Sequence, residues 1–258
     1  MPSLEGARIK LARALRHMDE LRGEARAYLE SSPYQLRESE EPNGDLVYRL
    51  QMVRSIPSEW AAIVGDAVHN MRAGLDLLAW QLVERNGGQP TRDTCFPIGP
   101  TAPAYDPALR RALAGAHPAA LRMIRRLRPY PGGNTFLTQL HALDIVDKHR
   151  LILIVGAAHK HLVLKMKMNV PWQPSPVEFP PLALNPADRQ FPLADGPEVF
   201  RVMAAARTGE LRPDHQLVFE LAFGDVSEVR GLPLVATLEA MHKHVSRVVE
   251  IATRRFFS

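Results

Sequence analysis

A helix predicted over residues 58–85 carries ionisable side chains along one of its sides. The polar stripe consists of Asp66, His69 and Asp76, with Arg72 at its edge and Asn70 beside it. A carboxylate beside an imidazole orients the ring and raises its pKa, which suits general acid–base catalysis. A nearby guanidinium can hold an anion or stabilise developing negative charge. The stripe is therefore a candidate for acid–base chemistry on an anionic or polar ligand.

A second set of ionisable residues lies near the end of a helix predicted over residues 135–149. His141, Asp144 and Lys148 share one stripe of this helix, and Asp147 is about 60° away from it. Four ionisable residues then follow one another, in the run Asp147-Lys148-His149-Arg150. If the two helices pack face to face, carboxylates, imidazoles and guanidinium groups from both come within pairing distance. We therefore hypothesise one site shared by both helices.

In this hypothesis the candidate catalytic residues are Asp66, His69, Asp76, Asp147 and His149, and the candidate ligand-binding residues are Asn70, Arg72, Lys148 and Arg150. His69 or His149 would be the base of a hydrolytic reaction, and Arg72 or Arg150 would hold an anionic small molecule. A buried Asp–Arg–His network that only joins two helices produces the same pattern without turnover. The residues alone leave both interpretations open, an enzyme or ligand-binding protein and a non-enzymatic interaction or regulatory protein.

Several segments resemble an uncharacterised bacterial family of similar length. The segment Gly-Asp-Ala-Val-His-Asn-Met-Arg at 65–72, followed by Leu75-Asp76, is similar to the family's Gly-Asp-x-x-His-Asn-x-Arg-x-x-Leu-Asp-His-Leu helix. The segment at 145–150, Ile-Val-Asp-Lys-His-Arg, is similar to its Ile-Asp-Lys-His-Arg segment. The resemblance spans about residues 45–152 and implies no particular activity. This chain has Leu77 where the family has a second histidine, which favours a structural role or a ligand site with reduced chemistry.

A looser similarity is to HEPN-type helical proteins, many of which cleave RNA. Their mark is an arginine followed after four to six residues by a histidine, and Arg111 and His117 fit it. The arginines at 122, 125, 126 and 128 can form bidentate hydrogen bonds with phosphates, although most runs of charged residues are solvated helix faces. A HEPN-like protein that binds or cleaves RNA is the third hypothesis.

No motif for a cofactor or a structural metal occurs, so we expect neither. Glycine-rich nucleotide loops, the Gly-x-Ser-x-Gly elbow, His-Glu-x-x-His and paired Cys-x-x-Cys are all missing. The strongest alternative is a metal pair at His159 and His161, with His215 as third ligand. A mixed site of Asp66, His69 and His149 is a further alternative.

Composition places the chain among folded proteins of ordinary type. It has 258 residues, 46% hydrophobic and 23% charged, with a formal net charge of +4, which excludes disordered, collagen-like and disulfide-stapled classes. The longest aliphatic stretch, residues 151–155, is far shorter than the roughly 20 residues of a membrane span. Cys95 is the single cysteine, and the first residues lack the apolar core of a secretory signal. We expect a soluble, cytoplasmic protein without membrane contact, of undetermined oligomeric state.

The helices and strands that position the candidate site are predicted from the periodicity of apolar residues and from the residues that end such elements. Helices are predicted over residues 5–31, 58–85, 106–115, 118–128, 135–149 and 233–255, and strands over 46–53, 160–168, 198–205 and 214–223. The prolines in residues 90–107 and 170–197 predict loops there. The fold class expected is α+β, mainly α, with a helical bundle and a small, mostly antiparallel β-sheet. We expect a single domain over residues 1–258.

Overall fold

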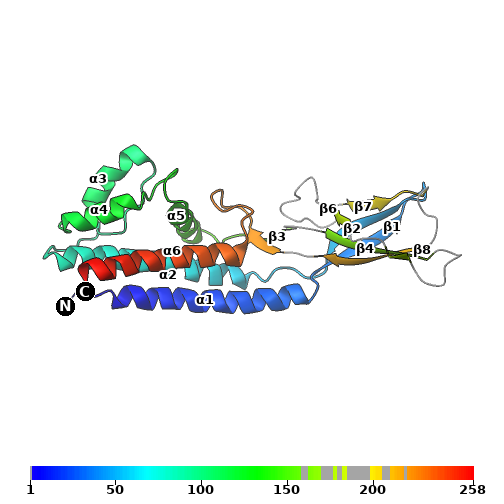
Figure 1. Cartoon of the computed structure of the whole chain (residues 1–258), viewed down its shortest axis with the longest axis horizontal. Coiled ribbons are helices and arrows are strands. Elements are labelled where there is room, and N and C mark those ends of the chain that lie inside the picture. Colours follow the sequence, from blue (N-terminus) through cyan, green and yellow to red (C-terminus); the bar gives the residue numbers. More distant parts are fainter. Residues whose placement is uncertain are drawn as a thin grey trace. The chain divides into compact units, whose positions relative to one another are not determined.

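The computed structural model describes residues 2–157, 162–169, 177–178, 182–184, 198–204, 210–217 and 220–258. Within these residues there are six α-helices and nine β-strands (Figure 1). Every pairing between the strands is antiparallel. The predicted class, α+β and mainly α with small antiparallel sheets, is therefore confirmed. None of the described helices combines the length and the apolar character needed to cross a membrane.

The chain forms two compact units, where the sequence analysis expected a single domain. One unit comprises Met1–Gly23, Ser58–Leu153 and Asp225–Ser258, and the other comprises Glu24–Pro57 and Ile154–Gly224. The first holds the helices except for residues 24–30 of α1, and we call it the helical unit. The second holds the strands, and we call it the β unit. Both candidate polar stripes belong to the helical unit.

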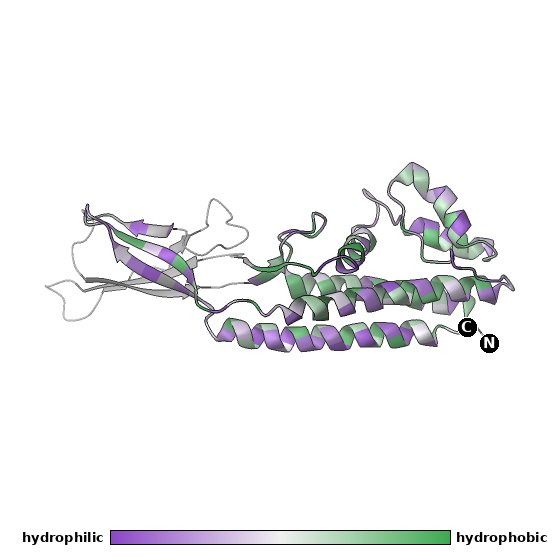
Figure 2. Ribbon diagram, turned by 180° about the vertical axis from the view of Figure 1, so that it is seen from behind, coloured by the Kyte–Doolittle hydropathy of each residue, from purple (hydrophilic) through white to green (hydrophobic). Residues whose placement is uncertain are grey.

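The helical unit is built on three long helices that run alongside one another, α1 (Glu5–Glu30), α2 (Glu59–Arg85) and α6 (Leu234–Phe256) (Figure 1). Hydrophilic and hydrophobic residues alternate along them in Figure 2, as expected of helices with one buried face. Side chains from all three form the core, among them Met18, Leu21, Met71, Leu75, Leu78, Leu238, Met241 and Val245. The Arg22 guanidinium of α1 also binds Glu239 of α6 at 2.6 Å.

Three shorter helices complete the unit, α3 (Ala102–Ala112), α4 (Pro118–Arg126) and α5 (Thr135–Asp147). Helix α5 contacts both α2 and α6. Helix α3 begins four residues before the predicted start, inside the segment that its prolines marked as a loop. The reason is that Pro103 falls in the first turn, where a missing N–H costs nothing, and the Thr101 side chain accepts a hydrogen bond from the Ala104 amide.

The β unit contains three antiparallel groups of strands. The first has the order β1 (Tyr34–Glu40), β2 (Leu46–Met52) and β7 (Glu198–Val202). The second pairs β3 (Ile154–Ala157) with β9 (Glu220–Phe223). In the third, β4 (Leu162–Asn169) pairs with β5 (Val177–Glu178), β6 (Leu182–Leu184) and β8 (Glu210–Leu217).

Three predictions in the β unit need correction. Strand β1 was missed because its sequence, Tyr-Gln-Leu-Arg-Glu-Ser-Glu, is largely polar, and its pairing with β2 over seven residues places it in a sheet. The strand predicted over 214–223 is divided between the end of β8 and β9. The short strands β5 and β6 fall within the proline-rich stretch 170–197, and the remainder of that stretch lies outside the described residues.

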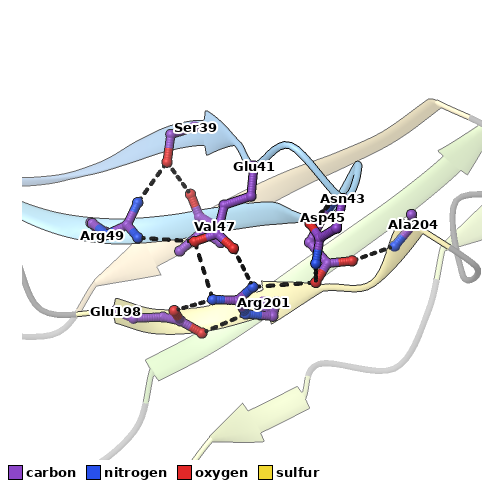
Figure 3. A network of polar contacts seen from close by, with 9 residues as sticks. All are labelled: Ser39, Glu41, Asn43, Asp45, Val47, Arg49, Glu198, Arg201 and Ala204. Carbon is purple, nitrogen blue, oxygen red and sulfur yellow. Dashed lines mark hydrogen bonds and ion pairs between the residues drawn. The ribbon is translucent and has the colours of Figure 1, made fainter.

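A network of ion pairs joins the turn between β1 and β2 to β7 (Figure 3). Arg201 of β7 donates to Glu41 at 2.7 Å, to Asp45 at 3.2 Å and to Glu198 at 2.8 Å. These bonds lower the pKa values of Glu41 and Glu198, and the backbone N–H of Ala204 is the main cause of the lowered pKa of Asp45. One guanidinium thus satisfies three carboxylates and ties the hairpin to its neighbouring strand.

Candidate functional site

Helices α2 and α5 come into close contact where Gly65 faces Asp147. A side chain at position 65 has no room, because the space of its Cβ is taken by the Asp147 carboxylate. The glycine therefore lets the end of α5 lie against the backbone of α2. This contact brings the two polar stripes together, as the hypothesis of a shared site requires.

The centre of the site is the carboxylate of Asp144 on α5, whose side chain is only 2% exposed. One oxygen, Oδ1, lies 3.5 Å from Nδ1 of His69 on α2. The other oxygen accepts a hydrogen bond of 2.6 Å from Nζ of Lys148, one turn further along α5. The His69 and Lys148 side chains are 55% and 54% exposed. The buried anion therefore lies beside two groups that reach solvent, and it is hydrogen-bonded to Lys148.

A second group of contacts fixes α2 to the segment before α3. The buried guanidinium of Arg72 lies 2.9 Å from Asp76 Oδ1 and donates to the Phe96 carbonyl at 2.8 Å. The Phe96 amide in turn donates to the same Asp76 oxygen at 2.8 Å. Burial is the main cause that raises the pKa of Asp76, and the Arg72 charge opposes it. Arg72 and Asp76 are thus occupied with each other and with the backbone.

Three buried polar atoms around Asp144 have no hydrogen-bond partner among the described residues. They are Nη1 of Arg72, Nδ1 of His141 and Oδ1 of Asp144 itself. Burial, followed by the positive charge of Arg72, lowers the pKa of His141, so that its ring is neutral at pH 7. Unpaired buried groups are costly, so this cluster holds hydrogen-bonding capacity that the fold itself does not use.

Negative charge predominates at the site. Burial raises the pKa of Asp147, and the nearby carboxylates of Asp144 and Asp66 raise it further. Four aspartates at positions 66, 76, 144 and 147 face two permanent cations, Arg72 and Lys148. A polyanion would therefore be repelled here, whereas a neutral polar molecule or one with a single anionic group would not.

Apart from Arg72 and Asp76, which bind each other and the Phe96 backbone, the predicted residues fall into three groups. The structure brings His69, Asp147 and Lys148 together, with Asp66 close enough for its charge to act on Asp147. The Asn70 side chain donates to the Asp66 carbonyl at 2.7 Å, within its own helix. His149 and Arg150 follow the end of α5; Arg150 pairs with Asp225, and the exposed His149 side chain forms no hydrogen bond or ion pair with a described residue. The expected roles of His149 and Arg150 thus have no contact in the site to support them.

Two residues of the site, Asp144 and His141, were not among the predicted functional residues. The sequence placed both on the stripe of Lys148, and their spacing from it was the available signal. The sequence alone could not show that these side chains are covered, because this depends on α2 packing against that face of α5. An acidic residue four positions before an exposed lysine usually lies on the surface.

The alternative sites find no support in the described residues. His117 is the N-cap of α4, and its Nδ1 accepts a hydrogen bond from the Ala119 amide at 3.1 Å, so the fold itself accounts for the histidine of the HEPN-like pair. Across the described part of the chain, no three His, Cys, Asp or Glu side chains are arranged to hold a metal ion. His159 and His161 lie outside the described residues, as does the side chain of His215.

Comparisons with protein-family models, with curated proteins and with solved structures gave no match.

Proposed function

We propose that the helical unit binds a polar or singly charged anionic small molecule at Asp144 and hydrolyses it by acid–base catalysis. The single observation that carries this proposal is the pairing of a nearly fully buried carboxylate, Asp144, with a half-exposed imidazole, His69. A buried carboxylate that orients an accessible imidazole is a recurrent arrangement for general bases.

His69 is the proposed base. When Nδ1 donates its proton to Asp144, the lone pair of the neutral ring lies on Nε2, which is the atom that removes a proton from an attacking water. The separation of 3.5 Å is long for a hydrogen bond. Such contacts in ligand-free enzymes commonly shorten when the substrate binds.

Lys148 is the proposed ligand-binding residue. Its ammonium group is held by Asp144 and remains half-exposed beside His69. It can donate to a polar oxygen of the ligand and stabilise negative charge that develops there. Asp66 and Asp147 border the same place, and their charges limit the ligand to one of low negative charge.

The test uses two chromogenic substrates, p-nitrophenyl acetate and bis(p-nitrophenyl) phosphate. His69→Gln should reduce the rate of hydrolysis by about 100- to 10,000-fold, as expected for the loss of a general base. His149→Gln distinguishes the two histidines of the original hypothesis and should retain the rate of the wild type. An equal rate for His69→Gln and the wild type, or a loss confined to His149→Gln, would rule out the proposed base.

A second candidate function is that of a non-enzymatic interaction protein. It is favoured by the contacts of Arg72, which all lie within the fold. Its guanidinium binds Asp76 and the Phe96 carbonyl, which is a structural use of the network. In that case Asp144→Ala would lower the stability by about 1–3 kcal/mol, because it removes the buried acceptor of the Lys148 hydrogen bond while Lys148 itself stays in solvent, with no activity to lose. Thermal unfolding of His69→Gln separates the two candidates, because this variant retains the stability of the wild type when the imidazole serves catalysis and loses stability when the His69–Asp144 contact is structural.

A further inference from the structure

Positive charge is concentrated in one segment of the helical unit. Residues 94–143 contain six arginines and a single acidic residue, Asp106, whereas the net charge of the whole chain is +4. The net positive charge of the chain therefore comes from the segment that forms α3 and α4. We call Arg110, Arg122, Arg125 and Arg126 the arginine surface.

The arginines lie on a helical hairpin whose alignment is set by two contacts. Asp106 of α3 binds Arg125 of α4 at 2.8 Å, and the Tyr105 hydroxyl donates to the Ile124 carbonyl at 3.5 Å. Arg110 follows Asp106 by four residues, and Arg122 precedes Arg125 by three. Arg110 on α3 and Arg122 on α4 therefore lie on the same helix faces as Asp106 and Arg125, one turn nearer to the loop that connects α3 and α4. Arg126 extends the same exposed side of α4.

Most of this charge is not neutralised. Asp106 pairs with Arg125, whereas Arg110, Arg122 and Arg126 are exposed and form no ion pair with a described residue. Arginines in the last turn of a helix interact favourably with its dipole, which accounts in part for Arg110, Arg125 and Arg126. It does not account for Arg122. Like charges on one short hairpin repel one another unless an anion lies between them.

An arginine and an aromatic ring are held in a fixed position at the end of α4. The Arg128 guanidinium lies 5.8 Å from the centre of the Tyr130 ring, and its Nε donates to the Tyr130 hydroxyl at 3.2 Å. The Arg128 backbone has a positive φ of 52°, and its carbonyl accepts hydrogen bonds from the amides of Tyr130 and Asn134, both at 2.8 Å. The Tyr130 ring also packs on Tyr105 at 5.4 Å. A guanidinium stacked on a ring offers a flat surface for a base.

We propose that the arginine surface binds the phosphate backbone of a single-stranded nucleic acid. Arginine forms bidentate bonds with phosphate, and Arg122 and Arg126, four residues apart, are separated by about 6 Å along the helix, so that neighbouring phosphates can be held by successive turns. The adjacent Arg128–Tyr130 stack favours a nucleic acid over an acidic peptide, because only the former has bases to stack. This function is independent of the Asp144 site, whose surplus of carboxylates repels polyanions.

The test measures fluorescence anisotropy of a fluorescein-labelled 20-nucleotide oligouridylate with the full chain. If four phosphates are neutralised, raising NaCl from 50 to 200 mM should weaken binding by about 50-fold. The double variant Arg122→Gln/Arg126→Gln should reduce that salt effect to about 7-fold and weaken binding at 50 mM by about tenfold. The matched control is Arg13→Gln/Arg16→Gln, two exposed arginines of α1, and it should bind like the wild type.

Three results would overturn the proposal. The first is the absence of binding at 50 mM NaCl. The second is an equal loss of affinity in the α4 variant and the α1 control, which would indicate a diffuse charge effect. The third is displacement of the oligonucleotide by polyglutamate as effectively as by unlabelled oligouridylate, which would assign the surface to an acidic protein segment. Circular dichroism of each variant is the control for folding, and all variants should give the spectrum of the wild type.

Discussion

The substitution Gly65→Ala tests the contact that brings the two polar helices together. Two effects oppose each other. Alanine in place of glycine inside a helix stabilises it by about 1 kcal/mol. The new Cβ, however, meets the Asp147 carboxylate, and inserting a group into an occupied space costs about 1–3 kcal/mol. The expected net result is a loss of about 1 kcal/mol.

A matched control exists on α1. Gly23 also lies inside a helix, and a Cβ added there meets nothing within 4 Å. Gly23→Ala should therefore show the helix gain alone, about 1 kcal/mol. In thermal unfolding, the midpoint of the Gly65→Ala protein should fall by about 2–4 °C, and that of the Gly23→Ala protein should rise by a similar amount.

The double variant Gly65→Ala/Asp147→Ala identifies the cause. The three nearest atoms to a Cβ at position 65 all belong to the Asp147 carboxyl group, so truncating that side chain removes the clash. In the Asp147→Ala background, Gly65→Ala should then be stabilising, as it is at Gly23. A gain in stability on Gly65→Ala alone, or the same loss in both backgrounds, would show that α2 and α5 do not meet here as described.

Two further predictions concern charges. Burial and neighbouring carboxylates raise the pKa of Asp147, so its ionisation costs stability as the pH rises from the unfolded value of 3.8 upward; Asp147→Asn should raise the thermal midpoint at pH 7 and leave it unchanged at pH 3. Arg201 lowers the pKa values of Glu41 and Glu198, so its contribution is present at pH 7 and lost as the pH falls below about 4. Arg201→Ala should therefore lower the urea midpoint of unfolding at pH 7 much more than at pH 3. The control is Arg37→Ala at an exposed arginine of β1, which should leave the midpoint unchanged at both pH values. An equal effect of the two variants would contradict a specific role for the network.

Local signals were sufficient for most of the helices. Helices α1, α2, α4, α5 and α6 lie within two residues of their predicted bounds because each has a clear breaker or cap at one end or both, to which α1, α2 and α6 add a periodic apolar stripe. Strand β1 lacked such a signal, since its polar residues take strand geometry only by pairing with β2. The β-propensity of a segment does not show which strand it will pair with.

Residue spacing alone shows which polar side chains share a helix face, because the period of the α-helix relates spacing directly to direction. The stripe with Asp66, His69 and Asp76 and the stripe with Asp144 and Lys148 both follow from that period. Which of these side chains meet depends on how the helices pack. The approach of α5 at Gly65 buries Asp144 and turns His69 toward it, whereas the end of α5 at Asp147 separates His149 and Arg150 from the site. Burial depends on what a neighbouring helix covers, and that is set by packing between residues far apart in the chain.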